Sequence, residues 1–270
     1  MTMQRTPLLM RRLLRRGATL SPNEEIVTLT AAGRQRQTYI ETWRRGAQLA
    51  NALFARGIAV GDRVASFMWN NARHLEMYQG VPCMGAVLHT LNIRLGPQDL
   101  EYIINHANDR VIVVDEDLLP ALETVKGRIP CVELFVICRE AGAEPVSTSL
   151  EPCIDYEDFI AGQPVDYAWP ELDENAPMGL CYTSGTTGEP KGVMYTHRST
   201  YLHTISSAMT DVAALSATDS LCGIVPMFHA MGWGMPFTAS MLGAKQVMPH
   251  RYMMPDKLVE LMQAEEGTVS

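Results

Sequence analysis

A run of hydroxyl, glycine and lysine residues in the second half of the chain has the composition of a phosphate-binding loop. It reads Tyr182-Thr183-Ser184-Gly185-Thr186-Thr187-Gly188-Glu189-Pro190-Lys191-Gly192 and follows an apolar segment. Glycines let backbone N–H groups approach a ligand closely, successive N–H groups form anion-binding nests, and hydroxyls add donors. Lys191 contributes a compact positive charge and is one of only four lysines in the chain. The composition therefore predicts a loop that cradles a polyphosphate.

Two better-known types of nucleotide loop are disfavoured. Pro190 stands where a Walker loop needs a glycine before the lysine, and the run contains no G-x-G-x-x-G pattern. The remaining alternative is a flexible connector of Ser, Thr and Gly. We favour the phosphate loop, because such connectors rarely end in Pro-Lys-Gly before a β-branched strand.

His229 is a second candidate for chemistry. It lies in Ser220–Ala244, a stretch without Asp, Glu, Lys or Arg, and directly follows Pro226-Met227-Phe228. A lone histidine in an apolar run is commonly a core residue, so the residues alone leave a core role and a site role open. The stretch is long enough to span a bilayer, but two prolines and four glycines favour a buried, site-lining segment.

The surrounding segments alternate β-branched runs with helical periodicity, which predicts an α/β fold with mostly parallel sheets flanked by helices. An N-terminal arm or amphipathic helix over 1–23, closed by Gly17, precedes this part. We expect a first α/β region over about 24–140, a proline-rich surface excursion over 141–177, and a phosphate-loop α/β region over 178–270. Expected strands include 25–30, 63–69, 110–115 and 132–138, and expected helices include 40–54 and 97–108.

The overall composition narrows the class of protein. The chain has 270 residues, a net charge of −8 and 47% hydrophobic residues, which indicates a globular fold and argues against nucleic-acid binding. Its six cysteines include no C-x-x-C pair, and no apolar core of signal-peptide length is present. We therefore expect a reducing, cytoplasmic setting.

Thr183 to Gly192 resembles the signature loop of the adenylate-forming, or AMP-binding, superfamily, which includes acyl-CoA synthetases, peptide-synthetase adenylation domains and luciferases. Gly61-Asp62-Arg63-Val64, Leu91-Asn92-Ile93-Arg94-Leu95 and Val225–His229 are similar to further segments of that family. Phe228–Gly234 is most similar to fatty-acyl-CoA ligases of the medium- and long-chain type. The likeness runs from about Glu25 to the end of the chain and implies the family's N-terminal α/β fold.

The resemblance implies ATP-dependent activation of a fatty acid to acyl-AMP, followed by transfer to the thiol of coenzyme A. It makes Lys191 and His229 catalytic, assigns His229, Ala230 and Trp233 to the acyl pocket, and places the Thr183 hydroxyl near Mg²⁺. The phosphates of ATP are assigned to Thr183, Ser184, Gly185, Thr186, Thr187, Gly188 and Lys191. The implied partners are a small-molecule acid, ATP and CoA, with at most peripheral membrane contact, and a homodimer is compatible with the family.

Three later segments of the family do not occur in this chain, namely Tyr-Gly-x-Thr-Glu, Thr-Gly-Asp and a C-terminal Gly-Lys. We therefore expect the front half of a family member, without the C-terminal lid domain and with little activity by itself. Two alternatives remain open. One is adenylation and CoA ligation of a short, sulfur-containing or aromatic acid, and the other is a non-catalytic nucleotide-binding fragment.

Overall fold

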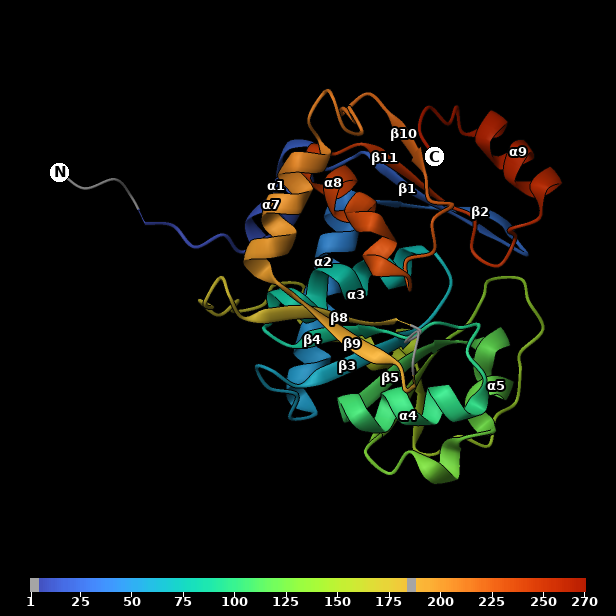
Figure 1. The fold of residues 1–270 in the computed structure, drawn as a ribbon. Coiled ribbons are helices and arrows are strands. Elements are labelled where there is room, and N and C mark those ends of the chain that lie inside the picture. The colour runs from blue at the N-terminus through green and yellow to red at the C-terminus, as the bar shows by residue number, and fades with distance from the viewer. Residues whose placement is uncertain (1–4, 184–187) are drawn as a thin grey trace.

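Two β-sheets with helices packed between and around them make up the chain (Figure 1). The computed structural model describes residues 5–183 and 188–270. The smaller sheet has the strand order β10-β11-β1-β2, with β1 (Glu25–Thr30), β2 (Gly33–Thr38), β10 (Ser220–Cys222) and β11 (Lys245–Met248).

The larger sheet has seven strands in the order β7-β6-β5-β3-β4-β8-β9. Among the strands of the described ranges, only the pairs β1–β2 and β8–β9 are antiparallel, which agrees with the expectation of mostly parallel sheets. The strands of the larger sheet are β3 (Arg63–Phe67), β4 (Val87–Thr90), β5 (Asp109–Asp115), β6 (Leu134–Cys138), β7 (Cys153–Asp155), β8 (Pro177–Thr183) and β9 (Lys191–Thr196).

The helices cover both faces of the larger sheet. In Figure 1, α2 and α3 lie between the two sheets, whereas α4 and α5 lie on the opposite side of the larger sheet. The helices are α1 (Met10–Leu20), α2 (Tyr39–Ala55), α3 (Ala72–Cys83), α4 (Pro97–Ala107), α5 (Leu119–Glu123), α6 (Tyr156–Ile160), α7 (His197–Ser207), α8 (Met235–Leu242) and α9 (Pro255–Ala264). Short 3₁₀ turns are η1 (Glu116–Leu118), η2 (Lys126–Arg128) and η3 (Ala230–Gly234).

Local sequence signals explain where several helices begin and end. A capping box opens α2, where the Thr38 hydroxyl accepts from the Glu41 N–H and the Glu41 carboxylate accepts from the Thr38 N–H. The Asn71 side chain caps α3 by accepting from the His74 N–H at 2.9 Å. Pro97 opens α4, and Asn108 ends it in the left-handed conformation with φ of 56°.

The structure differs from the sequence expectations in how distant segments combine. β8 and β9 join the same sheet as β3 to β7, while β11 pairs with β1 through the register Ile26 with Gln246. The expected early and late α/β regions are therefore interleaved. The 141–177 segment also contributes strand β7, which pairs with β6 at the edge of the larger sheet, and the short helix α6. It is therefore more than a surface excursion.

Gly17 does not end the first helix, because α1 continues through it to Leu20. A Cβ atom at Gly17 would lie 2.1 Å from the backbone oxygen of Ser240, at the start of the last turn of α8. The glycine therefore allows α1 and α8 to approach closely. No helix in the described ranges is long and apolar enough to cross a bilayer.

Candidate functional site: a phosphate-loop hairpin and an apolar cavity

The two ends of the predicted phosphate loop are paired in the β8–β9 hairpin. Met178 to Cys181 are buried in the sheet, and the chain then emerges so that Thr183 on β8 pairs with Lys191 on β9. Both side chains are exposed. The hairpin therefore places a hydroxyl and an ammonium side by side at the base of the loop.

The rest of the predicted loop is described only in part. Ser184, Gly185, Thr186 and Thr187 lie outside the described residues. Gly188 has φ of 114°, and a Cβ atom added there would meet no atom of the described residues within 4 Å, so the backbone conformation is what favours glycine. Within residues 5–183 and 188–270, no carboxylate forms an ion pair with Lys191, whereas Lys245 and Lys257 pair with Glu265 and Glu260.

His229 lies at the end of a segment that is anchored to the larger sheet. Phe228 is buried, its carbonyl accepts from the Thr90 hydroxyl at 3.3 Å, and the Arg94 guanidinium lies 5.9 Å from its ring centre. Thr90 is the last residue of β4, and Arg94 follows it closely in the chain. Because β4 runs parallel to β8, the end of β4 lies beside the end of β8 that leads into the phosphate loop. His229 therefore lies at the edge of the sheet where that loop begins. The His229 side chain is exposed, which excludes the core role.

Asn70 holds the backbone ahead of His229 in place. Its amide nitrogen donates to the carbonyls of Gly223 and Val225 at 2.7 and 2.8 Å, and its carbonyl accepts from the Met227 N–H at 2.8 Å. The residue is only 4% exposed, so these hydrogen bonds are shielded from water. Asn70 is a site-positioning residue that the sequence did not reveal, because its three partners lie more than 150 residues further along the chain.

The turn that follows His229 has an uncommon backbone. Five consecutive residues, Ala230 to Gly234, have positive φ values between 46° and 72°, and three of them are not glycine. Such a conformation costs on the order of 1 kcal/mol for each residue with a Cβ, so it persists only where packing enforces it. The His203 imidazole fixes the end of the turn through a hydrogen bond of 3.0 Å between Nε2 and the Trp233 carbonyl.

An apolar cavity of about 260 Å³ lies beside this turn. It is lined mainly by apolar side chains from η3, α8, β11 and the segment after β10, including Trp233, Met227, Met235 and Met248. Of the three residues assigned to the acyl pocket, Trp233 lines this cavity, whereas His229 and Ala230 do not. The cavity could hold a small hydrocarbon group.

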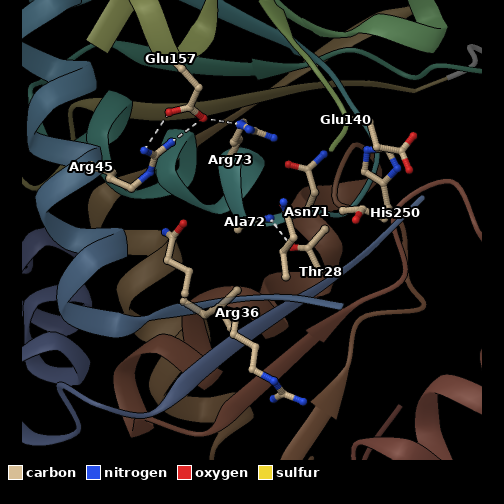
Figure 2. Close-up of a pocket in the computed structure, with 13 residues that line it drawn as sticks. Thr28, Arg36, Arg45, Asn71, Ala72, Arg73, Glu140, Glu157 and His250 are labelled. Carbon is tan, nitrogen blue, oxygen red and sulfur yellow. Dashed lines mark hydrogen bonds and ion pairs between the residues drawn. The ribbon is translucent and has the colours of Figure 1, made fainter. Parts of the chain in front are cut away.

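A larger and polar cavity of about 340 Å³ lies where the two sheets approach α3 (Figure 2). Figure 2 shows Arg45 and Arg73 on either side of Glu157, while Arg36 points away from them. Arg45 also contacts the buried carboxylate of Glu76 at 2.7 Å. Hydrogen bonds and ion pairs here connect α2, α3 and α6 with strand β2. We call the residues that form them the sheet joint: Gln37, Arg45, Arg73, Glu76, Tyr156 and Glu157.

Each charged side chain of the sheet joint forms an ion pair with another member of it: Arg45 with Glu76 and Glu157, and Arg73 with Glu157. The two oxygens of Glu76 accept from Arg45 and Gln37 and from the Tyr156 hydroxyl at 2.6 to 2.9 Å. Burial raises the pKa of Glu157, but the hydrogen bonds and charges of Arg45 and Arg73 outweigh it, so the pKa lies below its ordinary value. The arrangement is that of a structural connection between layers.

His197, which directly follows β9, is a structural residue. It is 1% exposed, and its Nδ1 accepts from the Met10 N–H at 3.4 Å, which joins α7 to α1. Burial lowers its pKa to about 4. The imidazole therefore stays neutral and takes no part in the exposed site.

Comparisons with known proteins agree with this geometry. Residues 14–270 match the sequence model of the family described as AMP-binding enzyme. The medium-chain-fatty-acid–CoA ligase of Ectopseudomonas oleovorans is 42% identical over 92% of this chain and 45% of that protein. The 3-methylmercaptopropionyl-CoA ligase of Ruegeria pomeroyi is 38% identical over 98% of this chain and 49% of that protein.

Solved structures show the same fold. The N-terminal domain of FACL13 from Mycobacterium tuberculosis is 26% identical, with a TM-score of 0.78 over 96% of this chain and 61% of that chain. The anthranilate CoA ligase AuaEII, in complex with anthranoyl-AMP, is 25% identical, with a TM-score of 0.79 over 90% of this chain and 45% of that chain.

The chain spans about half the length of the curated relatives that it matches. The family match covers both the β8–β9 hairpin and the segment around His229, and the structural matches have the α/β fold that was predicted. The chain therefore belongs to the AMP-binding enzyme family, and its fold corresponds to the N-terminal α/β domain of solved members.

Proposed function

We propose that this chain is the nucleotide-binding half of an AMP-forming acid–thiol ligase that activates a fatty acid. A carboxylate oxygen attacks the α-phosphorus of ATP, forming acyl-AMP and releasing pyrophosphate. The thiol of CoA then attacks the acyl carbonyl, so that a C–S bond forms and AMP leaves. The pairing of Thr183 with Lys191 at the base of the loop is the observation that carries this proposal.

The proposed roles of the site residues follow from their chemistry. The Lys191 ammonium neutralises phosphate charge, which helps an in-line displacement whose catalysis is mainly positioning and electrostatic stabilisation. Mg²⁺ would come bound to the phosphates of ATP, with the Thr183 hydroxyl as a protein oxygen ligand, because Mg²⁺ is usually held by substrate phosphates and water. His229 would face the reacting carboxylate, and the setting would be cytoplasmic.

The acid is proposed to place its hydrocarbon part in the apolar cavity beside Trp233. No charged side chain lines this cavity among the described residues. Each buried methylene contributes about 0.8 kcal/mol, or roughly fourfold in affinity. A fatty acid would therefore gain affinity with each added carbon until the cavity is full.

A short, sulfur-containing acid is the second candidate substrate, and the 38% identity to a 3-methylmercaptopropionyl-CoA ligase supports it. A series of straight-chain acids from four to twelve carbons, together with 3-methylmercaptopropionate, separates the two. The measurement is pyrophosphate exchange by the protein encoded by the complete reading frame. Rising specificity up to medium chain length supports a fatty acid, and a peak at the sulfur-containing acid contradicts it.

Nucleotide binding by the 270-residue chain is tested separately with a fluorescent ATP analogue. Binding that ATP displaces supports the proposed loop function, and the absence of binding contradicts it. ATP binding by the complete protein without pyrophosphate exchange for any acid would instead support a non-catalytic nucleotide-binding protein.

A further inference from the structure

Helix α4 passes beside the end of the β8–β9 hairpin and presents two aromatic residues to it. Tyr102 and His106 are four residues apart on α4, so they lie on one face of the helix, and their rings stack at 5.3 Å with an interplanar angle of 25°. The opposite face of α4 is anchored in the core by Leu100, Ile103 and Ile104. The stacked pair is therefore held on a rigid element.

His106 contacts the residue that precedes the phosphate loop. Its Nδ1 forms a hydrogen bond of 2.6 Å with the Tyr182 hydroxyl, and the two rings meet edge to face at 5.8 Å. Tyr182 directly precedes Thr183, the first predicted phosphate ligand. Burial, followed by the negative charge of Asp109, raises the pKa of Tyr182 to about 12, so the hydroxyl keeps its proton at neutral pH.

Tyr102 completes the aromatic stack beside His106. Desolvation, followed by the negative charge of Glu189, raises the pKa of the Tyr102 phenol. Tyr102 therefore supports the His106 ring, and the hydrogen bond of His106 with Tyr182 is the contact that joins this face of α4 to the hairpin.

A buried, hydrogen-bonded pair of side chains, His89 and Asp109, lies beneath this arrangement. The Tyr182 ring packs on the His89 imidazole at 5.1 Å, and His89 Nδ1 lies 2.8 Å from the Asp109 carboxylate. Both His89 and Asp109 are fully buried. The Tyr182 ring thus rests on His89 of the neighbouring strand β4, which is linked to Asp109 of β5 across β3, while the Tyr182 hydroxyl reaches α4.

We propose that α4 braces the strand that leads into the phosphate loop, through the hydrogen bond of His106 with Tyr182, and that these two are positioning residues for the nucleotide. The proposal rests on the proposed function of the loop. Fixing the residue beside Thr183 lowers the entropy lost when Thr183 is held against a ligand, which favours binding. Neither His106 nor Tyr182 needs to touch the nucleotide for this effect.

Cleavage by a lysine-specific protease tests the brace without any nucleotide. The chain has four lysines, and Lys191 is the one at the end of the loop. A partly exposed hydrogen bond contributes on the order of a two- to tenfold change in a local opening equilibrium. We expect Tyr182→Phe and His106→Ala to speed cleavage at Lys191 by about this factor, with cleavage at Lys126 and Lys257 unchanged.

Three further variants make this result specific. The double variant should be cleaved no faster than either single variant, because both remove the same hydrogen bond. His106→Asn should restore slow cleavage, since its amide places a polar atom near the position of Nδ1. Tyr167→Phe is the matched control, because the Tyr167 hydroxyl makes no hydrogen bond within the described chain and lies outside this region. Wild-type cleavage rates at Lys191 in both single variants would overturn the brace.

A titration with a fluorescent ATP analogue then tests the positioning role. Tyr182→Phe and His106→Ala should weaken binding by about two- to tenfold, while their thermal midpoints without nucleotide stay at the wild-type value. Equal affinity in variants that are cleaved faster would overturn the positioning role. Failure of the wild-type chain to bind would overturn the proposed function of the loop and the nucleotide role with it, whereas the cleavage rates would still decide whether α4 braces the hairpin.

Discussion

Charged side chains are used differently at the β8–β9 hairpin and at the sheet joint. At the hairpin, Lys191 is exposed and no carboxylate of the described chain pairs with it. In the sheet joint, the buried Glu76 carboxylate is shared by Arg45, Gln37 and Tyr156. One region keeps a charge available to solvent, and the other uses its charges within the protein.

The difference indicates which cations can serve a ligand. A guanidinium that already contacts two carboxylates, such as Arg45 with Glu76 and Glu157, has little net field left for an incoming anion. An exposed ammonium without such a partner can bind phosphate with no internal contact to break. The number of nearby arginines is therefore a poorer guide to a phosphate site here than the pairing state of one lysine.

Glu76→Gln should have the largest effect, because it breaks the sheet joint. The amide cannot accept from all three donors and leaves the Arg45 charge without its buried partner. We expect the free energy of unfolding to fall by about 3 kcal/mol, at the lower end for buried pairs because Arg45 is partly exposed. Urea denaturation measures this, with the exposed Glu260→Gln as control. A loss below about 1 kcal/mol would show that the joint is not structural.

Lys191→Met should weaken ATP binding but leave folding stability unchanged, in contrast to Glu76→Gln. Loss of a charge-assisted contact to phosphate should weaken ATP binding by about 10- to 100-fold. The free energy of unfolding should stay within about 0.5 kcal/mol of wild type, as for other surface substitutions. Lys257→Met, which removes a lysine paired with Glu260, is the control and should leave the affinity unchanged. If Lys191→Met lowered stability but bound ATP normally, Lys191 would be a structural residue and not a charge available to a ligand.

Asp115 tests a third situation, a buried carboxylate beside an uncharged imidazole, with the charges of Asp117 and Arg73 acting on its pKa in opposite directions. Burial is the main cause that raises its pKa to about 8, and the hydrogen bond from the Trp69 N–H opposes this. His250 lies 3.6 Å away, but burial lowers the pKa of that imidazole to about 4. Asp115 is therefore neutral in the folded protein at pH 7 and ionised in the unfolded chain, whose carboxyl pKa is about 3.9.

The sign of the pH effect follows from that difference. The folded state holds a proton that the unfolded state has lost, so stability present below pH 4 decreases as pH rises toward 8. We expect the free energy of unfolding to fall by about 1 kcal/mol between pH 7 and pH 8. Histidines with lowered pKa values oppose this fall slightly, because roughly a quarter of each is still protonated in the unfolded chain at pH 7. Asp115→Asn should lack the part of the fall that Asp115 contributes, about 1 kcal/mol relative to wild type, and an unchanged slope would refute the assignment.

Arg128→Gln should have the smallest effect. Arg128 pairs with Glu101 on α4, but the side chains remain 51% and 34% exposed, so water and salt screen the pair. We expect a change below about 0.5 kcal/mol, which corresponds to a shift of the thermal midpoint of no more than about 2 °C. A loss as large as that of Glu76→Gln would mean that exposure does not separate structural from dispensable pairs.

Much of the local structure could be predicted from the sequence. The strand at 110–115 and the helix from Pro97 appear nearly as expected, because an apolar run and an N-terminal proline act within a few residues. The loop flanks Thr183 and Lys191 were also found by composition, and the structure pairs them. The roles of His229, Ala230 and the loop residues remain predictions.

Contacts between distant segments could not be predicted in the same way. The anchoring of the His229 segment depends on Asn70, and the left-handed turn at Ala230–Gly234 depends on neighbours such as His203. Neither has a local sequence signal, because an asparagine and a Gly-containing turn are compatible with many loops. The resemblance to a family located the segment but did not explain what holds it.

Sequence patterns were enough to identify candidate phosphate-binding residues, most of the strands and helices, and the family that the chain resembles. These properties follow from side-chain chemistry, backbone propensity and periodicity, all of which act over short distances. Other features emerged only from the three-dimensional arrangement: β1 pairs with β11, Glu76 is shared between helices, and α4 contacts the strand that leads into the phosphate loop. Those outcomes depend on packing and on the burial of polar groups between segments far apart in the chain, where no local pattern records the partner.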